Sequence, residues 1–281
     1  MKIIDSDRYA EAGVETLFFP GGEPHVKVPL VTGGVLLHLK LRTWNDVGFA
    51  ALAIDAFERQ GQLRGVFIPY FPAARQDKTD GRAPLSLEVM ARLIGRTPIC
   101  VFDPHSAKLA EHAHIARAFM PEDLDLPRES DVVGIIAPDA GAQARATRFR
   151  DRFYPGLPVL LATKKRDQQT GRLSNYQLPA FEKAGRYIIV DDICDGGGTF
   201  NLLAEAFTQR AAELRAPCAL DLFVSHGLFS KGLEAISPVI GKIITTDSWC
   251  RLPGNDRLRV LSLAPILEAL TNQYEQGEPG A

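Results

Sequence analysis

The sequence predicts an α/β protein with mostly parallel sheets flanked by helices. Seven short apolar runs stop at turn or polar residues, as buried parallel strands do; they cover 65–71, 98–103, 132–139, 158–164, 187–192, 220–227 and 242–247. Stretches with an apolar residue every three or four positions, typical of amphipathic helices, cover 44–61, 84–95, 140–153 and 199–214. Strands that alternate with helices in this way favour parallel sheets.

The length of 281 residues is sufficient for two domains. The stretch "MPEDLDLPRES" at 120–130 is acidic, contains two prolines and lacks apolar periodicity, as linkers do. We therefore expect an N-terminal domain over 1–126 and a C-terminal domain over 127–281.

Composition argues against several classes of protein. The 32 basic and 34 acidic side chains give a net charge of -2, so no global positive charge attracts nucleic acid or an anionic membrane. Four scattered cysteines without CxxC spacing argue against a zinc site or a disulfide framework and favour a reducing cytoplasm; they are Cys100, Cys194, Cys218 and Cys250. The longest apolar runs are too short to span a membrane.

Polar side chains follow six of the predicted strands at the point where each strand ends. Ligands of open α/β sheets bind beyond the carboxyl ends of the strands, so this placement is typical of a site. At any single position, the simpler interpretation is that solvent begins there; six strand ends together favour a site. The residues are Arg75, Gln76, Asp77, Asp103, His105, Asp139, Lys164, Arg166, Asp191, Asp192, Asp195 and His226.

The stretch "YIIVDDICDGGGTF" at 187–200 combines an apolar run, acidic residues and three glycines. Glycines let backbone N–H groups approach a ligand, and a following helix N-terminus favours a phosphate. Asp191 and Asp192 would repel a bare anion, but they suit ribose hydroxyls or Mg²⁺. The alternative is a glycine-rich turn with solvated acids.

This stretch resembles the ribose-phosphate signature of type I phosphoribosyltransferases and of the ribose-phosphate diphosphokinases. Further segments are similar to diphosphokinases specifically: "IPYFPAARQDKTD" at 68–80, "FDPHSAK" at 102–108, "APDAGAQARA" at 137–146, "TKKRD" at 163–167 and "SHGLFS" at 225–230. The resemblance implies two type I phosphoribosyltransferase-like domains, the first with the ATP-binding segment and the second with the ribose-phosphate loop.

The resemblance also implies a reaction: transfer of the diphosphoryl group of Mg-ATP to the anomeric hydroxyl of ribose 5-phosphate, giving AMP. Lys164 and Arg166 would be catalytic. The ATP-binding residues would be Phe19, Glu23, Arg75, Gln76, Asp77 and His105. The ribose-phosphate residues would be Asp191, Asp192, Asp195, Gly196, Gly197, Gly198 and Thr199. Mg²⁺ would be held by His105, Asp139 and Asp191. We expect a cytoplasmic homo-oligomer of nucleotide biosynthesis with no nucleic-acid or membrane partner.

Simpler interpretations exist for individual residues. His105 suits a core histidine, the run from Lys164 to Arg166 suits a solvated loop, and Arg75 suits an ion pair with Asp77 or Asp80.

The chain also departs from the family. Gly21 replaces the aspartate of the family's Phe-x-Asp-x-Glu segment, which weakens the assignment of Phe19 and Glu23 to adenine contact. Gly196 and Gly197 replace Thr and Ala, which predicts extra room around the 5-phosphate. An acceptor with a further group on that phosphate, ADP-ribose in NAD salvage, is therefore a second hypothesis. A phosphoribosyltransferase and a non-catalytic regulatory homologue are the remaining alternatives.

Overall fold

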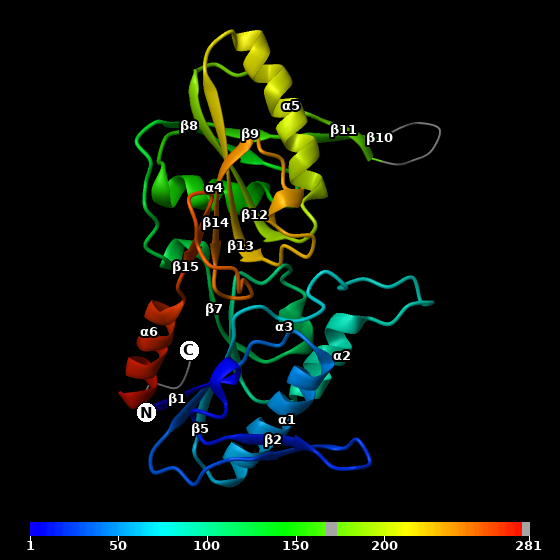
Figure 1. Cartoon of the computed structure of the whole chain (residues 1–281), viewed down its shortest axis with the longest axis vertical. Helices are drawn as coiled ribbons and strands as arrows, with labels where there is room; N and C mark the ends of the chain where they lie inside the picture. Colours follow the sequence, from blue (N-terminus) through cyan, green and yellow to red (C-terminus); the bar gives the residue numbers. More distant parts are fainter. Residues whose placement is uncertain (167–172, 277–281) are drawn as a thin grey trace. The chain divides into compact units, whose positions relative to one another are not determined.

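The computed structural model describes residues 1–166 and 173–276, with side chains described outside 164–175. It divides into two compact units (Figure 1): Met1–Met120 together with the segment that begins at Leu263, and Pro121–Ser262. Within the described ranges, every helix is too short or too polar to cross a membrane.

The first unit contains a five-stranded sheet in the order β1-β4-β5-β6-β7, with every neighbouring pair parallel. The strands are β1 (Lys2–Asp5), β4 (Val35–His38), β5 (Leu63–Ile68), β6 (Ile99–Phe102) and β7 (Ile115–Phe119). A separate antiparallel hairpin pairs β2 (Glu15–Phe18) with β3 (Pro24–Lys27). Because β4 to β6 are apolar at nearly every position, the sheet is covered on both faces.

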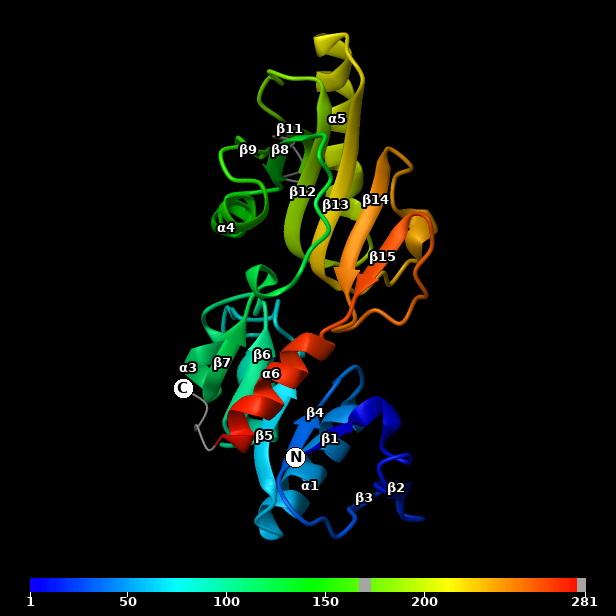
Figure 2. The same cartoon turned by 90° about the vertical axis from the view of Figure 1, so that its left-hand side faces the viewer.

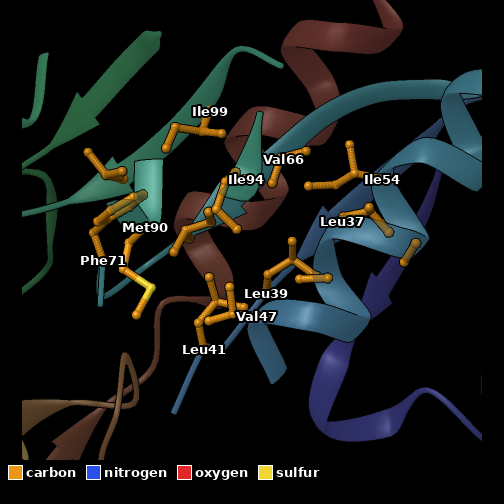
Figure 3. Packing of buried hydrophobic residues seen from close by; sticks show 14 of the residues in the cluster. Leu37, Leu39, Leu41, Val47, Ile54, Val66, Phe71, Met90, Ile94 and Ile99 are labelled. Atoms are coloured by element: carbon orange, nitrogen blue, oxygen red, sulfur yellow. The ribbon is translucent and has the colours of Figure 1, made fainter. Parts of the chain in front are cut away.

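Helices α1 (Trp44–Arg59) and α2 (Ser86–Ile94) cover one face of this sheet. Figure 3 shows part of this core, in which Ile54 of α1 lies near Leu37 and Val66 of the strands and Met90 of α2 lies near Phe71. Thr43 begins α1 with a capping box, since its hydroxyl accepts the N–H of Asp46 while the Asp46 carboxylate accepts the N–H of Thr43. The short helix α3 (Leu109–His112) follows β6.

The C-terminal helix α6 (Ala264–Glu275) packs against the sheet of the first unit (Figure 2). Its Tyr274 hydroxyl lies 3.8 Å from the Cys100 sulfur of β6, and its ring lies over Gly65 of β5. Gly65 and Cys100 point away from the α1 and α2 core, so α6 covers the second face.

The second unit contains a six-stranded sheet in the order β15-β14-β13-β12-β8-β9, again with every neighbouring pair parallel. Its strands are β8 (Val132–Ala137), β9 (Val159–Leu161), β12 (Gly185–Cys194), β13 (Cys218–Gly227), β14 (Ile240–Thr246) and β15 (Leu258–Leu261). An antiparallel pair, β10 (Thr163–Arg166) and β11 (Leu173–Gln177), lies between β9 and β12 in the chain.

One helix covers each face of this sheet. On α5 (Gly198–Leu214), Phe200, Leu203 and Phe207 pack in one core with Ile189 and Leu222. On α4 (Gln143–Phe153), Ala146, Phe149 and Phe153 belong to another core. That core also contains strand residues next in sequence to Ile189 and Leu222. Alternate residues of β12 belong to alternate cores, as the two-residue period of a strand requires.

The structure confirms the predicted fold class, since both sheets are parallel and flanked by helices. Each of the seven apolar runs overlaps a strand, and α1, α2, α4 and α5 overlap the four predicted helical stretches.

The division between units differs from the predicted domains. The first unit ends at Met120, six residues before the predicted boundary at 126, and the last helix belongs to it rather than to the second. Sequence periodicity cannot show which sheet a terminal helix covers, because Tyr274 finds its partners Gly65 and Cys100 far along the chain.

Candidate functional site

The second sheet has a topological switch point between β8 and β12. From β8 the chain passes through α4 to β9 on one side, and it later returns to β12 on the other side of β8. In open α/β sheets a ligand binds outside the carboxyl ends of the strands at such a point. Asp139 follows β8, and Asp191 and Asp192 lie among the last four residues of β12, so the predicted acidic residues lie at this edge.

The two aspartates of β12 share one cationic neighbour. Arg145, in the first turn of α4, places Nη1 at 3.9 Å from Oδ1 of Asp191 and Nη2 at 3.7 Å from Oδ2 of Asp192. The Arg145 side chain is 11% exposed and that of Asp192 only 6%, so this charge cluster is largely withdrawn from water. The N–H of Asp192 also donates to Oδ1 of Asp191 at 2.9 Å.

Burial and the neighbouring Asp192 raise the pKa of Asp191 well above its ordinary value, and Arg145 offsets this only in part. An additional cation would stabilise two carboxylates that lie this close together. The pair is therefore suited to a divalent ion or to hydroxyl donors, and unsuited to a bare anion.

The loop after β12 turns directly into α5. Gly197 adopts a left-handed conformation, with φ of 77°, immediately before the helix begins at Gly198. Among the described residues, no side chain caps this helix end, so its first N–H groups remain available to an anion. Ser230 donates to the carboxylate of Asp195 at 2.5 Å, which ties the loop to the turn after β13.

The Cβ positions of Gly196 and Gly197 are close to neighbouring side chains. A Cβ atom on Gly196 would lie 3.2 Å from Cδ and Cε of Lys231, and one on Gly197 would lie 3.2 Å from Cγ1 of Ile236. Neighbouring side chains therefore occupy the space that the missing side chains leave. Of the three glycines in this loop, Gly198 alone has no described atom within 4 Å of its Cβ position.

Asp139 turns toward its own loop, where Oδ1 accepts the N–H of Ala142 at 3.1 Å. Lys164 and Arg166 lie on β10, paired with β11. Their side chains are outside the described residues. His226, at the end of β13, is a buried core residue, because its Nδ1 lies 2.8 Å from the Ser248 hydroxyl and the residue is 1% exposed.

In the first unit, the segment with Arg75, Gln76 and Asp77 follows β5. Lys108 reaches across from the loop after β6 and donates its ammonium to the carbonyl of Asp77 at 3.0 Å. This contact joins the predicted ATP segment to the segment that contains His105. His105 itself is exposed, so the interpretation as a core histidine is wrong.

Two residues of these segments have strained backbones. Ala73 has φ of 56° and the fully buried Asp103 has φ of 37°, and neither is glycine. Left-handed backbone in a non-glycine residue costs free energy and is concentrated at functional sites. Each strained residue lies two positions before a predicted ligand, Arg75 and His105 respectively.

Phe19 and Glu23 form the tip of the β2–β3 hairpin, where the N–H of Phe19 donates to the carbonyl of Glu23 at 2.9 Å. The Phe19 ring is 47% exposed and lies 5.4 Å from the His25 ring. An aromatic ring exposed on a tight hairpin is available for a contact outside its own unit.

Sequence reasoning missed two residues of this edge, Arg145 and Lys231. Arg145 lies in "APDAGAQARA", six positions after Asp139, and a helix that begins after the strand turns its first residues toward the strand ends. The place of Arg145 at this edge could therefore have been predicted from the sequence. The approach of Lys231 to Gly196 spans 35 positions and has no counterpart in local pattern.

An acidic switch point beside a glycine loop and an uncapped helix end defines an α/β protein of the class that binds phosphorylated sugars or nucleotides. No family model matches the chain. It is 30% identical to a ribose-phosphate pyrophosphokinase of Granulibacter bethesdensis over 237 residues, which are 77% of this chain and 72% of that protein. It is 29% identical to the enzyme of the same name from Maricaulis maris over 232 residues, with the same two coverages.

The fold agrees with these relatives. A crystal structure of phosphoribosylpyrophosphate synthetase from Mycobacterium smegmatis superimposes with a TM-score of 0.76 at 20% identity, covering 99% of this chain and 100% of that chain. The chain belongs to the ribose-phosphate pyrophosphokinase family, whose members are ATP-dependent diphosphokinases.

Proposed function

We propose that this protein transfers the β,γ-diphosphoryl group of Mg-ATP to the anomeric hydroxyl of ribose 5-phosphate. The hydroxyl oxygen attacks the β-phosphorus and loses its proton, the bond from that phosphorus to the bridging α-phosphate oxygen breaks, and AMP leaves with that oxygen. The observation that supports it best is the Asp191–Asp192 pair at the switch point, followed at once by the glycine loop.

The residues of the second unit suit the acceptor. Asp191 and Asp192 would accept hydrogen bonds from ribose hydroxyls, and the backbone of Asp195, Gly196, Gly197, Gly198 and Thr199 would bind the 5-phosphate. Arg145 limits repulsion between the two carboxylates and holds them in place for the sugar. Helix N-terminal N–H groups add partial positive charge to the phosphate site.

The residues predicted for ATP and for the chemical step keep those roles in this proposal. Arg75, Gln76 and Asp77 would bind ATP together with His105, and Phe19 and Glu23 would contact adenine. Lys164 and Arg166 would stabilise the negative charge that develops on the transferred group, which is the main catalytic requirement of phosphoryl transfer.

The carboxylates also fit Mg²⁺. No cluster of three or more metal-ligating side chains forms in the part of the chain that the structure describes. Mg²⁺ is, however, commonly held by one or two carboxylates with phosphate oxygens and water completing its shell. Asp191 and Asp139 would supply such ligands in the second unit, and His105 would supply one in the first. When bound, the ion would neutralise charge on the ATP phosphates.

ADP-ribose is the second candidate acceptor. Its main support was the room expected at Gly196 and Gly197, and that space is filled by Lys231 and Ile236. Ribose 5-phosphate is therefore the first choice. The same reaction on ADP-ribose would place the protein in NAD salvage.

The test is a paired assay with Mg-ATP and each acceptor, following AMP release and product mass. AMP with ribose 5-phosphate supports the first proposal, and AMP with ADP-ribose alone supports the second. Lys164→Ala should abolish activity with the preferred acceptor. Base-dependent release of diphosphate without ATP would indicate a phosphoribosyltransferase instead, and no reaction at all would indicate a non-catalytic homologue.

A further inference from the structure

The turn after β13, residues 228–232, is attached to the glycine loop by several hydrogen bonds. The N–H groups of Leu228 and Phe229 both donate to the carbonyl of Cys194, at 2.8 and 3.1 Å, and the hydroxyl of Ser230 donates to Asp195. The position of the next residue, Lys231, is therefore fixed relative to the loop.

Lys231 lies across Gly196. Its Cγ, Cδ and Cε atoms all lie within 3.5 Å of the position that a Cβ on Gly196 would take, so the glycine is what lets the lysine stem pack there. Within the described residues, the Lys231 ammonium makes no hydrogen bond or ion pair, and the residue is exposed. Long basic side chains often pack their stem on the protein and leave the charge in water. Here that charge borders the loop proposed to bind a phosphate.

The backbone before Lys231 is strained in the same way as the backbone before Arg75 and His105. Phe229 has φ of 46° and lies two positions before Lys231. Observed strain of this kind is a reason to look for function. Three of the four left-handed non-glycine residues in the described chain thus lie two positions before Arg75, His105 or Lys231.

We propose that Lys231 binds the phosphate on C5 of the sugar acceptor and so helps to determine acceptor affinity. This inference rests on the proposed function. The loop supplies N–H donors and the start of α5 supplies partial positive charge, but a phosphate dianion gains further from a full cation beside them. Lys231 is placed to supply it, and Gly196 makes its approach possible.

The direct test compares wild type, Lys231→Met and Lys231→Arg. The control is Lys242→Met, which removes a lysine of the same unit that pairs with Glu129. A lost charge-assisted contact corresponds to about a 10- to 100-fold change in affinity. We expect Lys231→Met to raise the KM for the acceptor by about that factor, with kcat and the KM for ATP little changed. Lys231→Arg should retain most of the affinity, and Lys242→Met should behave as wild type.

Ribose 5-phosphate and ADP-ribose are tested separately, since both present a phosphate on C5. An unchanged acceptor KM in Lys231→Met, with active enzyme, overturns the inference and leaves the proposed function intact. If wild type releases no AMP with either acceptor, the proposed function fails. Calorimetric binding of ribose 5-phosphate without ATP then decides: weaker binding to Lys231→Met supports the inference, and equal binding or no binding to wild type overturns it.

Gly196→Thr gives a second, independent variant. A side chain at this position requires Lys231 to move, so it should weaken acceptor binding in wild type. In the Lys231→Met background the same substitution should cost markedly less, because the two changes act on one contact. Equal effects in both backgrounds would contradict the proposed partnership of Gly196 and Lys231.

Discussion

The guanidinium of Arg145 lies 3.7 Å from the carboxylate of Asp192, joining the first turn of α4 to the end of β12. Because both side chains are largely buried, removing the arginine leaves the negative charge of the buried carboxylates less well neutralised. Arg145→Met should lower the free energy of unfolding by about 2 kcal/mol. Added Mg²⁺ should then raise the melting temperature more in this variant than in wild type.

Thermal unfolding with and without Mg²⁺ measures both effects. Arg259→Met, which removes an exposed arginine of the same unit, is the control. Equal stability and an equal response to Mg²⁺ in Arg145→Met and wild type would show that the arginine does not compensate the aspartate pair.

Gly197→Ala should destabilise the loop. Its φ of 77° is unfavourable for a residue with a Cβ, and that atom would lie 3.2 Å from Ile236. We expect a loss of about 1 to 2 kcal/mol of stability and a higher acceptor KM. Gly198→Ala is the matched control for stability, because its Cβ position is open and its φ is not left-handed. Urea unfolding of both variants compares them; a larger loss for Gly198→Ala would contradict this account.

Asp5 and His38 end the adjacent strands β1 and β4, and Nδ1 of His38 donates to Asp5 at 2.9 Å. Burial acts to raise the pKa of Asp5, but the hydrogen bond and charge of His38, with the N–H of Asp7 and the charge of Lys40, outweigh it and lower the pKa from 3.8 to about 2. Because the folded-state pKa is depressed, ionised Asp5 stabilises the fold above about pH 4, and this contribution is lost as the pH falls toward about 2.

Asp5→Asn should therefore lower stability at neutral pH by about 1 to 2 kcal/mol, allowing for the partial exposure of the side chain, and flatten the dependence of stability on pH below about pH 4. Chemical unfolding across that pH range measures the slope. Asp55→Asn removes an exposed carboxylate on α1 and serves as the control. A slope in Asp5→Asn as steep as that of wild type would refute the role of this pair.

Gly65→Ala tests the assignment of α6 to the first unit. A Cβ on Gly65 would lie 2.5 Å from Cε2 of Tyr274, so the ring must move. Overpacking of this kind costs about 1 to 3 kcal/mol. In Tyr274→Ala the same substitution should cost little, since the obstructing ring is gone. Urea unfolding of the two single variants and the double variant gives the coupling, and strictly additive losses would count against the contact.

The sequence was sufficient for most of the inner strands of the two sheets. β6 is apolar throughout and β12 contains the apolar run 187–190, so their letters identify them directly. The inner strand β4 was missed, although it is buried. Two edge strands were missed because they are short and partly polar: β7 contains "IARAF", and β15 contains only "LRVL". The hairpin strands β2 and β3 are mostly exposed and lack a buried face that would set a pattern.

The acidic residues of the switch point could also be predicted from the sequence, because Asp139, Asp191 and Asp192 each come after an apolar run. The surroundings of Gly196 could not be predicted from the sequence. Glycine in a sequence specifies a missing side chain, but not what fills its place, and here the stem of Lys231 does so from the next strand connection. The contact between Lys231 and Gly196 is therefore a tertiary feature that the local sequence does not predict.

The most direct test of the central claim is the nucleotide product formed when the full chain is incubated with Mg-ATP and ribose 5-phosphate. Transfer of a diphosphoryl group predicts AMP and phosphoribosyl diphosphate in equal amounts, and neither product when ATP or the sugar phosphate is left out. Formation of ADP, or of AMP without a diphosphate on the sugar, would contradict the proposed reaction.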